Sequence, residues 1–183
     1  MSVFQSKRER RLWIIIVLTL IVIYSTMGIV LSMNEKLVEW GFTTVGFVFC
    51  MALVAVMALT HALITKKGWA EIAVWIGIIA VYFLVFIRMA LPAERSHLIE
   101  YGVIALLVYE AFLERNRHSG KVPFPLLMAI LVAFVFGAID EVIQYFHPRR
   151  YFDPVDLLFN LLAAIMAVGS SWLLRWVRTK LSQ

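Results

Sequence analysis

Long apolar runs alternate with short polar segments along most of this chain. The first run, Leu12–Ser32, follows a polar and basic start. At about 1.5 Å per helical residue it is long enough to cross the roughly 30 Å hydrocarbon core of a bilayer. Five further runs are expected to do the same, at Phe42–Ile64, Ile72–Leu91, His97–Leu113, Phe124–Phe146 and Val155–Trp176. The pattern predicts an all-α fold, a polytopic bundle of six transmembrane helices.

The boundaries of these runs are marked by proline. Pro92 is expected to end the third run, with a polar loop from Arg88 to His97 leading into the fourth. Pro148 follows the fifth run, and Pro154 is well placed for the first helical turn of the sixth. The fourth run is the weakest, because it is short and interrupted by acidic residues.

Composition supports the same fold class. Of the 183 residues, 62% are hydrophobic, whereas a soluble domain is about half apolar. The length suits one bundle, so residues 1–183 are expected to form a single transmembrane domain. In the sixth run, Ala163 and Ala167 form a small-xxx-small pair, which predicts close packing against another helix.

The distribution of charge orients the predicted bundle. The formal net charge is +5, and with six spans 12 of the 17 lysines and arginines lie on the side of the termini. Lysine and arginine collect on the cytoplasmic side, so both termini are expected there. Basic residues confined to short loops argue against nucleic-acid binding. Glu110 and Glu114, one turn apart near the cytoplasmic end, are expected to form a solvated interfacial face.

Ionisable residues concentrate where the fifth and sixth runs meet, in the stretch 137–160 (GAIDEVIQYFHPRRYFDPVDLLFN). Asp140 and Gln144 are one helical turn apart, as are Asp156 and Asn160, so each pair shares a helix face. In the predicted topology this stretch lies at the outer mouth of the bundle. Charged groups at membrane depth are costly and usually mark a functional site.

The candidate binding residues come from three runs and the loops beside them. They are Arg88, Arg95, His97, Glu100, Tyr101, Asp140, Glu141, Gln144, Arg149, Asp153, Asp156 and Asn160. One interpretation is a structural plug in which arginines pair with carboxylates to hold the helices in register. The other is an outward pocket for a polar headgroup or an anionic ligand, since planar arginine forks suit phosphate and carboxylate.

The sequence offers no familiar metal or nucleophile motif. The four histidines form no HExxH or HxH pair, and Cys50 is the only cysteine. We therefore expect no metal site, no cofactor and no GxSxG-type catalysis from local spacing.

Three blocks carry a resemblance to a known family. They are ERSHLIEYG at 94–102, DEVIQYFHPR at 140–149 and DPVDLLFN at 153–160. In order, spacing and placement around apolar runs they resemble the VanZ-like membrane proteins, over roughly residues 88–170. One departure is Ala163, where the family pattern usually has glycine, and alanine is small enough for the same close packing.

The resemblance implies a multi-pass protein of the bacterial cytoplasmic membrane. Some members are similar to a factor that lowers susceptibility to teicoplanin, a lipoglycopeptide that acts at the outer face of that membrane. The leading expectation is a non-enzymatic protein that binds membrane lipids, a lipid-linked cell-wall precursor or a lipoglycopeptide. The alternative is an enzyme that uses Asp140, Glu141 and His97 for acid–base chemistry on a lipid headgroup. A flippase or transporter ranks third.

Overall fold

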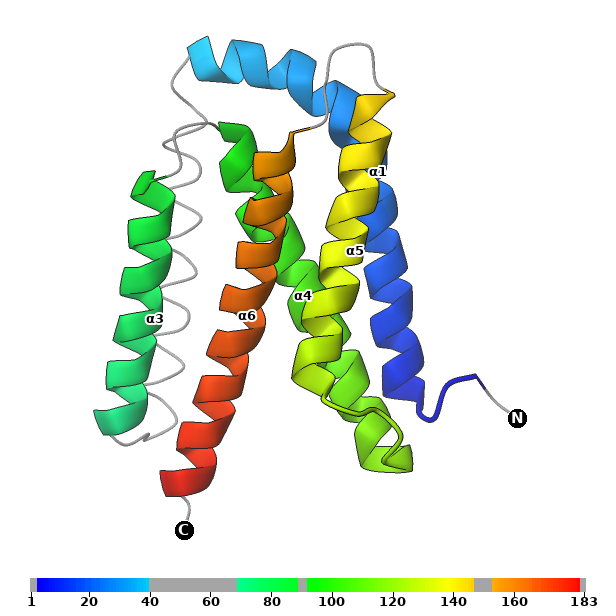
Figure 1. The fold of residues 1–183 in the computed structure, drawn as a ribbon, viewed down its shortest axis with the longest axis vertical. Helices are drawn as coiled ribbons and strands as arrows, with labels where there is room; N and C mark the ends of the chain where they lie inside the picture. Colours follow the sequence, from blue (N-terminus) through cyan, green and yellow to red (C-terminus); the bar gives the residue numbers. More distant parts are fainter. Residues whose placement is uncertain (1–2, 40–68, 89–91, 147–152, 182–183) are drawn as a thin grey trace. The chain divides into compact units, whose positions relative to one another are not determined.

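The computed structural model describes residues 3–39, 69–88, 92–146 and 153–181, and these ranges contain five helices and no strand (Figure 1). The helices are α1 (Lys7–Glu39), α3 (Trp69–Arg88), α4 (Pro92–Ser119), α5 (Pro125–Tyr145) and α6 (Pro154–Leu181). The all-α prediction is confirmed for this part of the chain. The second expected run, Phe42–Ile64, lies outside the described residues.

Helix α4 begins earlier than the sequence suggested. The expected loop from Arg88 to His97 is wrong over its second half, because Pro92 is the first residue of a helix that continues to Ser119. Proline suits a first helical position, since its fixed φ matches the helix and its missing N–H would be unpaired there anyway. Pro92 therefore begins α4, although in the sequence it also follows the apolar run that forms α3.

Proline also begins α5 and α6. Pro125 follows Phe124, which has a φ of 47°. Pro154 lies in the first turn of α6, as predicted, and Asp153 caps that helix by accepting a hydrogen bond from the Val155 N–H at 2.8 Å. A carboxylate at this position satisfies a backbone donor that has no partner within the helix.

The chain divides into two compact units, each considered by itself. One consists of residues 1–28 and 96–169, and the other of residues 29–95 and 170–183. In the second unit, α3 pairs with the last part of α6 through Arg178, whose Nε donates to Glu71 Oε1 at 2.7 Å. The described candidate binding residues between His97 and Asn160 belong to the first unit.

Helix α4 is the central helix of the first unit. Its buried residues include Tyr101, Ile104, Val108 and Ala111, and these lie on several sides of the helix. Helices α1, α5 and α6 all contribute to the core around it. This position explains why α4 was the weakest run, because a helix surrounded by protein can carry polar residues that its neighbours partner.

The packing of α4 against α6 uses small residues. A Cβ placed on Gly102 would lie 3.7 Å from Ala167 Cβ and 3.9 Å from the Ala163 carbonyl oxygen, and both alanines are buried. The predicted role of Ala163 and Ala167 in close helix packing is thus confirmed. Small side chains let two helix backbones approach, which is the usual device in membrane bundles.

Helix α5 is more polar inside than outside. Its exposed face is aliphatic: Leu127, Leu131, Val135, Ile139 and Val142. Its buried face is small or polar: Ala129, Ala133, Gly137, Asp140, Glu141 and Gln144. A helix that turns aliphatic side chains outward and carboxylates inward suits lipid rather than water. Pro125–Tyr145 and Pro154–Lys180 are, in the described part of the chain, the two helices long and apolar enough to cross a membrane.

The start of α1 and the end of α4 form an ionic layer at one end of the first unit. Arg115 Nε donates to Glu9 Oε1 at 2.6 Å, and Arg8 pairs with Glu110 at 3.2 Å. Glu114 accepts a hydrogen bond from the Ser6 hydroxyl at 2.8 Å and is only 7% exposed. The solvated face expected at Glu110 and Glu114 is therefore wrong for Glu114, because α1 covers it.

Candidate functional site

Six of the predicted residues meet at the other end of α4. His97 lies near the start of α4, and the remaining five come from α5, α6 and the residue before α6. We call these residues the polar cluster: His97, Asp140, Glu141, Gln144, Asp153 and Asp156. Because α4 and α5 run in opposite directions, the start of one helix lies beside the end of the other (Figure 1).

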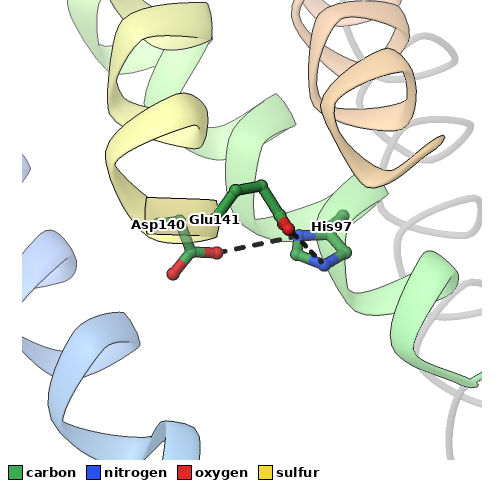
Figure 2. A group of neighbouring side chains, drawn as sticks. All are labelled: His97, Asp140 and Glu141. Atoms are coloured by element: carbon green, nitrogen blue, oxygen red, sulfur yellow. Dashed lines mark ion pairs between the residues drawn. The ribbon is translucent and has the colours of Figure 1, made fainter. Parts of the chain in front are cut away.

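The imidazole of His97 lies at the centre of the polar cluster. Its Nδ1 is 3.9 Å from Asp140 Oδ2, and its Nε2 is 4.0 Å from Glu141 Oε1 (Figure 2). Nε2 is also 3.6 Å from Asp156 Oδ2. The side chains of His97, Asp140 and Glu141 are at most 3% exposed, while that of Asp156 is 15% exposed. Asp156 thus lies on the more accessible side of the cluster.

The two carboxylates of α5 are fixed by hydrogen bonds. Gln144 Nε2 donates to Asp140 Oδ2 at 3.2 Å and to Glu141 Oε1 at 3.3 Å. The spacing of these residues along the helix, i to i+4 and i+1 to i+4, brings one amide against both carboxylates. The backbone N–H of Asp153 donates to the second Glu141 oxygen at 3.3 Å. Both oxygens of Glu141 are therefore held in place.

Tyr101 and Asn160 support the cluster from α4 and α6. Tyr101 is fully buried and stacks on His97, with ring centroids 5.9 Å apart and planes inclined by 20°. Asn160 is fully buried against Gly137 of α5, where an added Cβ would lie 2.8 Å from Asn160 Cβ. Gly137 was not among the candidate residues, and the signal that could have found it was its place one turn before Asp140.

The remaining candidates are Glu100 and three arginines. Glu100 is partly exposed, one turn along α4 from His97. The predicted contacts of three arginines with the carboxylates stay predictions, since the side chains of Arg88, Arg95 and Arg149 lie outside the described residues.

The arrangement has two chemical capacities. A histidine beside carboxylates can accept and release a proton, as general acid–base catalysis requires. His97, Asp140 and Glu141 also place one ligand atom each within 4.8 Å of one another, which is a set that can hold a metal ion. We expected no metal site from local spacing, and this set escapes such a search because its residues come from two helices.

Comparison with known proteins identifies a family for the whole constellation. The family described as VanZ/LLP1 matches residues 11–175, which is most of the chain. The match includes all six residues of the polar cluster and confirms the resemblance seen in the three sequence blocks. Neither a curated protein nor a solved structure matches this chain.

Proposed function

The chain belongs to the VanZ/LLP1 family, and from that premise we propose that it binds a polar headgroup at the outer leaflet of the bacterial cell membrane. The headgroup would be that of a membrane lipid, a lipid-linked cell-wall precursor or a lipoglycopeptide such as teicoplanin. The observation that carries the proposal is the polar cluster itself. It places the carboxylates of Asp140, Glu141 and Asp156 beside the imidazole of His97, among helices whose outer surfaces are aliphatic.

The depth of the cluster supports a site at one membrane surface. His97 and Arg115 lie near opposite ends of α4, and at about 1.5 Å per residue they are roughly 27 Å apart along the helix. That separation is close to the roughly 30 Å thickness of a hydrocarbon core. The ionic layer around Arg115 and the polar cluster around His97 would then lie at the two surfaces of one bilayer.

The orientation follows from charge. The ionic layer includes the basic start of α1 and the basic end of α4. Lysine and arginine favour the cytoplasmic side, so this layer would face the cytoplasm and the polar cluster would face outward. We therefore retain six spans with both termini in the cytoplasm as part of the proposal.

Aromatic residues next to the cluster fit the headgroup level. Tyr145 and Phe146, which follow Gln144 directly, are 65% and 78% exposed, and their rings pack edge to face with centroids 5.4 Å apart. An exposed aromatic ring with a polar tip, as in Tyr145, is typical of membrane interfaces. In the sequence Arg149 follows three residues later, and an arginine there would suit a phosphate or carboxylate group of the ligand.

Binding can be measured directly with the full chain in lipid nanodiscs. Labelled teicoplanin and the cell-wall precursor lipid II serve as separate probes. We expect wild type to bind at least one of them, and Glu141→Gln and Arg149→Ala to weaken that binding at least tenfold. Val142→Ala is the matched control, because Val142 is next to Glu141 but lies on the exposed face.

Two results would contradict the binding proposal. One is that wild type binds neither probe and carries no lipid beyond that found in empty nanodiscs. The other is that Glu141→Gln binds as tightly as Val142→Ala. Teicoplanin susceptibility of a host that expresses each variant separates the two probes in cells. If the site binds the lipoglycopeptide, the susceptibility of the host should change in parallel with the affinity of each variant for teicoplanin.

A second candidate function is favoured by the contact between His97 and the carboxylates. With Asp156 Oδ2 at 3.6 Å, His97 has the surroundings of a general base in a membrane enzyme that acts on a lipid headgroup. Incubation of the purified chain with labelled lipid II and undecaprenyl phosphates tests this directly. A new product that is absent with His97→Gln would favour the enzyme, and no product would leave only the binding function.

A further inference from the structure

We propose that the polar cluster is a binding site for one divalent transition-metal ion, held by His97, Asp140 and Glu141, with Asp156 as an additional ligand on the accessible side. This inference does not require the proposed headgroup function. It concerns what the buried donor atoms of His97, Asp140 and Glu141 bind.

The distances between the donor atoms fit a shared ion better than direct hydrogen bonds. His97 Nδ1 lies 3.9 Å from Asp140, and His97 Nε2 lies 4.0 Å from Glu141 and 3.6 Å from Asp156. A hydrogen bond between such atoms would be about 2.7–3.2 Å long. Two donors that each lie about 2.1 Å from one ion are separated by roughly 3 to 4.2 Å, depending on the angle between them. Each separation falls in the second range, but an ion binds only one of the two imidazole nitrogens. The third ligand would therefore close in on it from within the 4.8 Å that separates one donor atom each of His97, Asp140 and Glu141.

The imidazole provides an independent reason to expect a ligand. His97 is only 2% exposed, and neither of its ring nitrogens has a hydrogen-bond partner among the described residues. A buried polar atom without a partner costs about 1–3 kcal/mol, so such atoms call for an explanation. Figure 2 shows both carboxylates of α5 directed toward the ring, so that an ion bound to either nitrogen would have a carboxylate oxygen near it.

The surrounding hydrogen bonds resemble those that orient metal ligands. Gln144 donates to the same two oxygens, Asp140 Oδ2 and Glu141 Oε1, that approach His97 most closely. The Asp153 N–H fixes the other oxygen of Glu141. Groups that hold ligands in this way raise metal affinity by about 10–100-fold.

The type of ion follows from the ligand atoms. Imidazole nitrogen favours zinc, iron and similar metals, whereas carboxylate oxygen suits manganese and magnesium. Calcium takes six to eight oxygen ligands, and magnesium dehydrates reluctantly, so neither suits a compact buried set that includes a histidine. Mn²⁺ and Zn²⁺ are therefore the probes of choice.

Metal content of the full chain, purified in detergent, tests the proposal. The protein is first stripped with a chelator and then equilibrated separately with MnCl₂ and ZnCl₂. We expect about one ion of at least one metal per wild-type chain, by mass spectrometry of the metal and by the electron paramagnetic resonance of Mn²⁺. Glu141→Gln and His97→Gln should each weaken retention at least tenfold, and Gln144→Leu about tenfold.

A matched control tests whether the loss of any buried carboxylate, rather than one in the polar cluster, lowers metal retention. Glu114 is a buried glutamate at the other end of α4 and accepts hydrogen bonds in the ionic layer. Glu114→Gln should retain the ion as wild type does. Size-exclusion profiles and helical circular dichroism identify any variant that fails to fold, in which case Asp140→Asn replaces it.

Two outcomes overturn the metal site. The first is a folded wild-type chain that retains neither Mn²⁺ nor Zn²⁺ in stoichiometric amount. The second is equal retention by wild type, Glu141→Gln and His97→Gln. Since no lipid or antibiotic is added in this experiment and the readout is the metal ion alone, its failure is separate from a failure of headgroup binding.

Discussion

The contact between Gly137 and Asn160 leads to a sharp prediction about the packing of α5 against α6. Replacing Gly137 with alanine adds a Cβ that would lie 2.8 Å from both Cβ and Nδ2 of Asn160 and 3.0 Å from its Cγ. Asn160 Cβ is bonded directly to the helix backbone, so it cannot rotate away. The two helices must therefore separate if alanine is to fit.

The size of the effect can be worked from these distances. Carbon atoms are in favourable contact at about 3.5–4.0 Å, so the added atom is about 0.7 Å or more too close. Overpacking of this kind costs about 1–3 kcal/mol, and the upper end applies because backbones must move. Alanine is favoured over glycine within a helix by about 1 kcal/mol. The net loss in the free energy of unfolding should be about 1–2 kcal/mol, a factor of roughly 5–30 in the equilibrium constant.

The assay is reversible unfolding in mixed detergent micelles, followed by circular dichroism. Gly102→Ala is the matched control, because its added Cβ would meet Ala167 Cβ at an ordinary 3.7 Å. It should leave stability unchanged or raise it by up to about 1 kcal/mol. A double-mutant cycle with Asn160→Gly removes the clashing Cβ, so Gly137→Ala should cost less in that background.

Equal stability of Gly137→Ala, Gly102→Ala and wild type would refute this reasoning. So would a cost for Gly137→Ala that is the same with asparagine or glycine at position 160. Either result would mean that α5 and α6 do not approach closely at Gly137.

Further predictions concern the ionic layer, the contact of α1 with α5, and topology. Arg115→Ala leaves the buried carboxylate of Glu9 without its 2.6 Å partner and should lower the free energy of unfolding by about 2 kcal/mol, with part of the loss recovered when Glu9→Gln is added. Tyr24→Phe removes a 2.9 Å hydrogen bond to the carbonyl of Phe136 and should cost about 0.5–1.5 kcal/mol in the same assay, and no loss would contradict that contact. Alkaline phosphatase inserted after Gly120 should be inactive, whereas insertion after Phe146 should give activity; the reverse pattern would contradict an outward-facing cluster.

The helices could be predicted from the sequence, but their ends were less certain. The apolar runs predicted the existence of α1, α3, α4, α5 and α6, and Pro154 predicted the start of α6. The start of α4 was missed because a proline after an apolar run fits the end of one helix as well as the start of the next. The burial of Glu114 was missed because Ser6, its partner, is far away in the sequence.

The candidate site was found through helix periodicity and the family resemblance, but its geometry was not. Asp140, Glu141 and Gln144 share a face by spacing alone, and so could be grouped in advance. The central place of His97 depends on how α4 crosses α5, which no local pattern records. For the same reason a metal search by motif spacing could not detect ligands that come from separate helices.

The central position of α4 has a consequence for biogenesis. A segment that carries Glu100, Glu110 and Glu114 is less apolar than the other runs and partitions less readily into lipid by itself, because charged residues are unfavourable in a membrane-spanning helix. Its hydrogen-bonding partners Ser6 and Arg8 belong to the first segment synthesised, whereas α5 and α6 emerge later. We therefore expect α4 to stay beside α1 at the insertion machinery until α5 and α6 arrive. Only then can the newly made chain leave for the surrounding lipid.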